Sequence, residues 1–154
     1  MEKTLLSMTF VILYKSIYIN AEVFNFMAKV LIQKGKEKRI EAGHPWVYDN
    51  EISDVEGSYE NGDIVDIYNW KNKFIGRGYI NNNSKIRIRI LTRQKEEINK
   101  DFFRNRILKA WEYRKMVVDT SSCRVVFGEA DFIPGLIVDK FGDYLSLQTL
   151  SLGI

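Results

Sequence analysis

The side chains with the clearest chemical potential lie in a short basic segment that leads into an aromatic turn. Residues 27–46 read MAKVLIQKGKEKRIEAGHPW, and four cations fall within six positions: Lys34, Lys36, Lys38 and Arg39. Such a density of ammonium and guanidinium groups can neutralise phosphates. The segment closes on Gly43-His44-Pro45-Trp46. A basic run that precedes an aromatic turn is typical of small nucleic-acid-binding folds.

Charge is also segregated further along the chain. The net charge of +3 is modest, but residues 48–70 hold seven acids and no Lys or Arg, whereas residues 71–93 hold seven Lys or Arg and no acid. If these blocks fold onto different faces, they form single-sign patches, and a basic patch steers a polyanion. If they lie side by side, they neutralise each other, and charge runs are commonly no more than solvated faces. The sequence leaves both alternatives open.

Residues 85–90, KIRIRI, give the clearest strand pattern. Strict alternation predicts that Ile86, Ile88 and Ile90 face a core and that the cations between them point away together. The outward cations, Arg87 and Arg89 among them, either contact phosphates or are ordinary solvent-facing strand residues.

Other chemistries are poorly supported. Gly76-Arg77-Gly78 is not followed by a helix, so a dinucleotide loop is not predicted. Glu129 and Asp131 are better explained as turn-capping acids than as a cation site. One cysteine, Cys123, and one histidine, His44, exclude an internal disulfide, a cysteine-based zinc site and a His-rich metal cluster. We expect Cys123 to be a buried thiol and His44 to be a hydrogen-bonded turn residue, with RNA contact as the alternative, and we predict no catalytic residue and no metal.

The elements that position these groups are mainly strands. Turn residues and apolar runs predict strands at 28–32, 46–48, 64–68, 73–80, 85–90, 123–127, 135–139 and 144–150. Between them, Asn99 can cap a helix that runs to about Met116 and has an apolar face formed by Phe103, Ile107, Ala110 and Trp111. The sequence therefore predicts a β-rich α+β protein in a reducing, cytoplasmic setting.

Residues 1–26 differ from the rest in being apolar and nearly uncharged. Their uninterrupted apolar stretch stops at Lys15, which is too short to span a bilayer. Three interpretations stand: a segment upstream of a true start at Met27, an added strand or helix, or a targeting segment. We favour the first and expect no membrane partner.

Several segments together resemble one known family. Residues 34–39 and 43–48 resemble the opening of a PUA domain, an RNA-binding domain, in the version that heads the ribosomal RNA large-subunit cytosine-5 methyltransferases. Later segments fit the same family: 74–79 with 81–84, 86–89, and 127–131 through 134–139. The resemblance runs from Met27 to the C-terminus, and it is specific only when the segments are taken together.

The resemblance implies a three-part architecture. A PUA-like small β-barrel at 27–80 precedes a central strand-helix-strand domain at 81–154, which we expect to be incomplete, and residues 1–26 are an extension. In the family a C-terminal Rossmann-like domain binds S-adenosylmethionine and carries the catalytic cysteine. That domain has no counterpart in this sequence, and Cys123 does not occupy the place of the catalytic cysteine. We therefore expect a truncated chain that holds no cofactor and is inactive by itself.

The implied function is RNA binding. The chain resembles the substrate-positioning N-terminal portion of a 23S rRNA (cytosine-5) methyltransferase, and dimers are compatible with the family. The expected RNA-binding residues are Lys34, Lys36, Lys38, Arg39, His44, Arg77, Arg87 and Arg89. The alternatives are an isolated PUA-domain RNA-binding protein, a degenerate remnant without activity, or one part of an enzyme whose remaining domain is on another chain.

Overall fold

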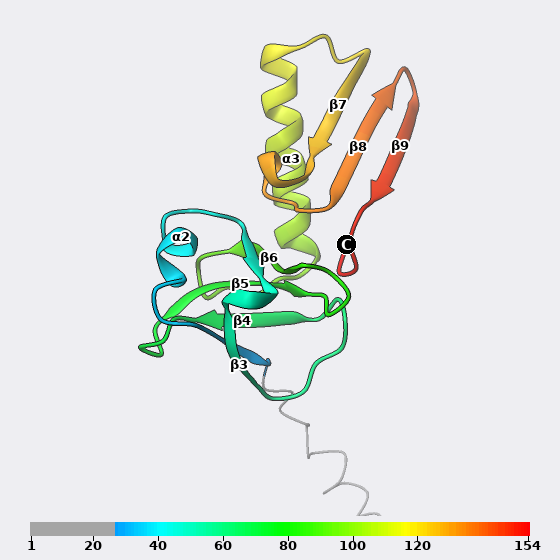
Figure 1. Cartoon of the computed structure of the whole chain (residues 1–154). Coiled ribbons are helices and arrows are strands. Elements are labelled where there is room, and N and C mark those ends of the chain that lie inside the picture. Colours follow the sequence, from blue (N-terminus) through cyan, green and yellow to red (C-terminus); the bar gives the residue numbers. More distant parts are fainter. Residues whose placement is uncertain (1–26) are drawn as a thin grey trace, which may run out of the picture.

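The computed structural model describes residues 27–154, so the interpretations of residues 1–26 lie outside the described residues. Two units are joined end to end (Figure 1): a six-stranded sheet, and a helix packed on a three-stranded sheet. The predicted β-rich α+β class is confirmed. None of the helices within 27–154 is long and apolar enough to cross a membrane.

The first unit is built from short strands and one short helix. The strands are β1 (Lys29–Ile32), β2 (Trp46–Tyr48), β3 (Ile52–Glu56), β4 (Ile64–Tyr68), β5 (Phe74–Ile80) and β6 (Ile86–Thr92), with α2 (Glu37–Glu41) between β1 and β2 and a 3-10 turn, η1 (Asp49–Glu51), before β3. Their order in the sheet is β2-β6-β5-β4-β1-β3. β1 and β4 are parallel, and every other neighbouring pair is antiparallel.

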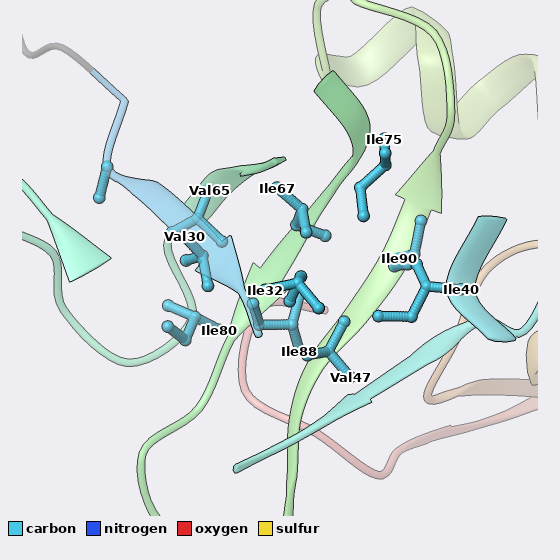
Figure 2. Close-up of a cluster of buried hydrophobic side chains, with 11 residues drawn as sticks. Val30, Ile32, Ile40, Val47, Val65, Ile67, Ile75, Ile80, Ile88 and Ile90 are labelled. Atoms are coloured by element: carbon cyan, nitrogen blue, oxygen red, sulfur yellow. The ribbon is translucent and has the colours of Figure 1, made fainter. Parts of the chain in front are cut away.

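Alternating apolar residues fill the inside of this curved sheet. Figure 2 shows Val30, Ile32, Val65 and Ile67 facing one another, with Ile40 of α2 entering the same cluster. The alternation predicted for β6 is confirmed at Ile88 and Ile90, which belong to this core together with Val47, Ile75 and Ile80, whereas Ile86 at the start of the strand is only partly buried. Full burial of each such side chain contributes about 1.5–3 kcal/mol, so this core stabilises the sheet that carries the basic segment.

The second unit contains α3 (Lys100–Val117), β7 (Ser122–Phe127), a 3-10 turn η2 (Gly128–Asp131), β8 (Leu136–Phe141) and β9 (Tyr144–Thr149). The predicted cap is present, since the side chain of Asn99 accepts a hydrogen bond of 3.0 Å from the Phe102 amide. The predicted apolar helix face packs on β7 and β8, where Ala110, Val126 and Val138 are buried together. The helix predicted between Asn99 and about Met116 is therefore confirmed.

A further apolar cluster joins the two units. Tyr79, Leu91 and Phe102 are buried together, so the face of β5 and β6 that points away from the first core is covered by the second unit. The Tyr79 hydroxyl donates to the Pro134 carbonyl and accepts from the Ser151 hydroxyl at 2.9 Å. Figure 1 shows the C-terminal segment running back to this joint.

Strand β6 bears on where the two units divide. We predict from the sequence a domain boundary after residue 80, which would assign β6 to the second unit. This boundary stays a prediction. In the structure β6 pairs with β2 and β5 of the six-stranded sheet. We propose that the first unit includes β6 and that the division falls in the connection between Thr92 and α3.

Candidate nucleic-acid interface

The loop before α2 and the first turn of α2 (residues 33–38, here called the lysine loop) present the lysines of the basic segment to solvent. Lys34, Lys36 and Lys38 are exposed. Gly35 turns the chain in the left-handed region at φ 91°, and the Lys36 amide donates to the Gln33 carbonyl at 3.0 Å. Within residues 27–154 these three lysines take part in no ion pair. Their ammonium groups are therefore available to an external anion.

Glu37, the acid inside this basic run, points inward. One of its oxygens accepts from the Gly35 amide at 2.6 Å, and the other accepts from the Trp70 indole at 3.2 Å. The pKa of Glu37 is lowered, first by the hydrogen bond from its own backbone amide and then by those from Gly35 and Trp70, while desolvation opposes them. Because both oxygens are engaged, Glu37 braces the loop, and sequence reasoning missed this role.

Arg39 is held by an internal carboxylate. Its Nη2 lies 2.6 Å from Glu51 Oε2 and 2.8 Å from Glu51 Oε1, and it also donates to the Trp46 carbonyl at 3.1 Å. The guanidinium stacks over the Tyr48 ring at 5.1 Å. Arg39 therefore ties α2 to the start of β2 and to η1.

His44 is a hydrogen-bonded turn residue. Its Nδ1 accepts from the Trp46 amide at 3.2 Å, and its ring meets the Trp46 ring edge to face at 5.6 Å. Arg93 holds the same turn by donating to the carbonyls of Ile40 at 2.6 Å and His44 at 3.0 Å. The Trp46 indole in turn donates to Glu129 of the second unit at 2.8 Å.

Arg77 lies in the interior. Its side chain forms an ion pair with Asp66 at 2.7 Å, and both residues are less than a tenth exposed. A second donor group of Arg77 reaches the Glu96 carbonyl. The strand requires glycine beside Arg77, because a Cβ at Gly78 would overlap the carbonyl oxygen of Arg89 on β6. The Gly76-Arg77-Gly78 segment is thus a place where the backbones of β5 and β6 come close together.

Arg87 and Arg89 sit on the β6 face that points away from the first core. Arg87 pairs with Asp49 at 3.2 Å and donates to the Asn82 carbonyl at 3.1 Å. Arg89 lies opposite Tyr79 in the strand register and lines a cavity of about 180 Å³ with Glu129 of the second unit. The structure therefore groups Lys34, Lys36 and Lys38 on one short segment, whereas Arg77 and Arg89 lie at or near the joint.

A cleft of about 870 Å³ runs along the joint. It is lined from both units by groups of both signs, including Arg93, Glu97, Asp101 and Arg106. Burial lowers the pKa of the Arg106 guanidinium, which lies 4.0 Å from the centroid of the Phe102 ring. Among residues 27–154 no three His, Cys, Asp or Glu side chains gather to hold a metal ion. The mixed charge of this cleft makes it a weaker polyanion surface than the lysine loop.

Of the two acids after β7, Asp131 caps the turn as predicted, whereas the Glu129 side chain instead accepts from the Trp46 indole of the first unit. Asp131 accepts from the Phe127 amide at 2.6 Å and from Arg114 at 2.6 Å, which fixes η2 against α3. Cys123 is partly buried on β7 beside the helix. Neither arrangement brings a nucleophile and a base together.

Comparisons with known proteins agree with this geometry. The sequence model of the PUA-like domain family matches residues 30–93. Ribosomal RNA large subunit methyltransferase I of Vibrio cholerae is 34% identical over 127 residues, which cover 80% of this chain and 32% of that protein. The protein of the same name from Tolumonas auensis is 36% identical over 128 residues, with the same coverage of 80% and 32%. The chain thus spans about a third of the length of these curated relatives.

Solved structures share the fold at low sequence identity. "A putative sam-dependent methyltransferase from Streptococcus mutans" superimposes with a TM-score of 0.71 at 17% identity, over 82% of this chain and 34% of that one. A second structure, "a putative methyltransferase complexed with SAH", gives a TM-score of 0.70 at 17% identity over 82% and 33%. The fold of this chain over both units is therefore shared with part of each of these two solved structures.

Proposed function

We propose that this chain binds and positions ribosomal RNA. The premise is that it corresponds in sequence and fold to the N-terminal, PUA-containing portion of the large-subunit ribosomal RNA methyltransferases. The observation that carries the proposal is the loop before α2, which presents Lys34 and Lys36 to solvent without ion-pair partners inside the described region. Phosphate contacts of this kind fix the position of an RNA without reading its sequence.

The roles within the proposed surface follow from the contacts. Lys34, Lys36 and Lys38 contact phosphates. Arg39 is a positioning residue, because its guanidinium is already engaged by Glu51 and holds α2 in place. His44 keeps one ring nitrogen for an external contact, since its Nδ1 is used by the Trp46 amide.

The three arginines on β5 and β6 have different roles. Arg77 supports the sheet through its buried pair with Asp66. Arg87 is partly buried and pairs with Asp49, and Arg89 faces the joint. RNA contact by Arg87 and Arg89 is a secondary element of the proposal, whereas the buried Arg77, expected from the sequence to bind RNA, has a structural role.

The chemistry of the whole protein is part of the same proposal. The curated relatives are named as large-subunit ribosomal RNA methyltransferases, and we extend this to methylation of 23S rRNA at cytosine C5 with S-adenosylmethionine as the methyl donor. The Gly76-Arg77-Gly78 segment does not form a loop for that cofactor, because it lies inside β5 and a Cβ at Gly78 would overlap the Arg89 carbonyl of β6. The contribution of these residues is to bind and orient the RNA.

A salt titration of RNA binding tests the proposal. The affinity of the full chain for fragments of large-subunit ribosomal RNA should fall steeply with salt, because bound phosphates release counterions. The double variant Lys36→Glu/Lys38→Glu should weaken binding and reduce the slope of log K against log salt by about 1.4–1.8 for two lost phosphate contacts.

The matched control is Lys95→Glu/Lys100→Glu, which makes the same change in net charge at two exposed lysines outside the basic segment. It should leave the slope close to that of the wild type. Binding that does not respond to salt, or an equal effect of the two double variants, would refute the lysine loop as the RNA surface.

A further inference from the structure

Trp70 is the most exposed of the three tryptophans. It lies in the connection between β4 and β5, and 45% of its surface is exposed. Trp46 and Trp111 are partly buried and take part in the joint and in the helix–sheet core. A single exposed aromatic is ordinary on a protein surface, so its surroundings decide whether it has a role.

The indole is fixed at its polar edge. Its Nε1 donates to Glu37 Oε1 at 3.2 Å, and Glu37 is only 8% exposed. The other oxygen of Glu37 holds the Gly35 amide in the lysine loop. One buried carboxylate therefore sets the position of the Trp70 ring relative to Lys34 and Lys36.

The turn that carries Trp70 is also rigid. Asn69 is 6% exposed, and its Oδ1 accepts from the amides of Lys71 at 3.0 Å and Lys73 at 3.1 Å. Its Nδ2 donates to Glu41 at the end of α2 at 2.9 Å. Hairpin and helix thus form one preorganised unit, so a ligand that binds there orders little additional structure.

Two ammonium groups flank the ring. Lys34 Nζ and Lys71 Nζ each lie 5.0 Å from the centroid of the Trp70 ring. Lys34 belongs to the lysine loop, and Lys71 follows Trp70 in the β4–β5 hairpin. Two ammonium groups therefore lie near the ring face, while Glu37 and Glu41, which keep their negative charges, are held by hydrogen bonds from Trp70 and Asn69.

We propose that Trp70 is a stacking platform for an unpaired base of RNA, and that Lys34 and Lys71 leave the ring to contact the phosphates on either side of that base. This inference rests on the RNA binding proposed above and names a contact within it. Base stacking on an aromatic ring is stronger than an exposed cation–π contact, so a base can displace a lysine from the ring. The site takes single strands, loops or bulges, because bases within a helix are already stacked on one another.

The test compares variants of the full chain in binding a labelled single-stranded oligouridine and a short RNA duplex. Trp70→Ala should lose roughly 5- to 150-fold in affinity for the single strand, the range that stacking of one base supports. The loss of affinity for the duplex should be much smaller. The salt slope should stay unchanged, because no cation is removed.

Two further variants separate stacking from structure. Trp70→Phe loses the hydrogen bond to Glu37 but keeps an aromatic ring. Because stacking needs only the ring, this variant should retain most of the affinity that Trp70→Ala loses. Tyr113→Ala removes an exposed aromatic residue from α3, far along the chain from the lysine loop, and should bind as the wild type does. Urea unfolding of each variant checks that the fold is intact.

The outcomes distinguish this inference from the proposed function. Equal losses for Trp70→Ala and Trp70→Phe would overturn stacking and assign the effect to the Glu37 brace. Equal affinities of Trp70→Ala and Tyr113→Ala, with salt-dependent binding preserved, would also overturn it, while RNA binding by the lysine loop stands. If the wild type shows no salt-dependent RNA binding, the proposed function itself fails.

Discussion

Replacing Tyr79 by phenylalanine tests how the two units are held together. The Tyr79 side chain is 1% exposed, and its hydroxyl donates to the carbonyl of Pro134, which is itself fully buried. The same hydroxyl accepts from Ser151 at 2.9 Å. Tyr79→Phe keeps the ring in the apolar cluster with Leu91 and Phe102 and removes only the oxygen.

The magnitude follows from the groups left behind. The Pro134 carbonyl loses its donor at a site where water does not reach, which costs about 1–3 kcal/mol for a buried unsatisfied acceptor. Ser151 is partly exposed and can turn its hydroxyl to water, so it adds little. We expect Tyr79→Phe to lower the free energy of unfolding by about 2 kcal/mol at pH 7.

A pH dependence accompanies this change. Burial raises the pKa of Tyr79 to about 12, from an ordinary value of 10.0. The unfolded chain therefore releases this proton near pH 10, while the folded chain keeps it until about pH 12. Stability from this group is complete below pH 10 and is lost as the pH rises to about 12, by about 2.7 kcal/mol at most for a shift of this size. Phenylalanine has no such proton, so the difference between the two proteins should shrink across that range.

The assay is urea unfolding of the wild type and Tyr79→Phe, followed by tryptophan fluorescence between pH 7 and pH 12. Tyr113→Phe, at an exposed tyrosine of α3, is the matched control and should change stability by less than about 0.5 kcal/mol. A Tyr79→Phe variant as stable as this control at pH 7 would refute the role assigned to the hydroxyl. A stability difference that stays constant from pH 10 to pH 12 would refute the burial argument.

Two further predictions concern the first unit. Glu51→Gln should destabilise the chain by about 2–3 kcal/mol in urea unfolding, because Glu51 is 7% exposed and its charge is paired with Arg39; an effect below about 0.5 kcal/mol would contradict the bracing role. Gly78→Ala should cost about 3 kcal/mol or more, since its Cβ meets the Arg89 carbonyl. Gly142→Ala, at a positive φ with open space around it, should cost only about 1–2 kcal/mol, and equal midpoints for the two glycine variants would argue against the steric explanation.

Much of the local structure could be predicted from the sequence. Alternation in residues 85–90 predicted which isoleucines enter the core, and the Asn99 cap and apolar spacing predicted α3, because both patterns are set by backbone geometry. The exposure of Lys34 and Lys36 follows in the same way from a basic loop beside a glycine. The cluster of Lys34, Lys71 and Trp70 could not be predicted, since it joins two turns that are far apart in the sequence.

The sequence by itself determined which residues of β6 share a strand face, that a helix follows Asn99 and where the basic loop lies. Only the tertiary structure decided what covers each face. Arg87, Arg89 and Leu91 were on one side of β6 by periodicity, but packing of the second unit buries Leu91 and turns Arg89 toward the joint. Likewise, a carboxylate within a basic run became the brace of the loop because Glu37 finds Trp70 across the fold. The physical reason is that side-chain direction is a local property of the backbone, whereas burial and charge pairing depend on which distant segment packs against it.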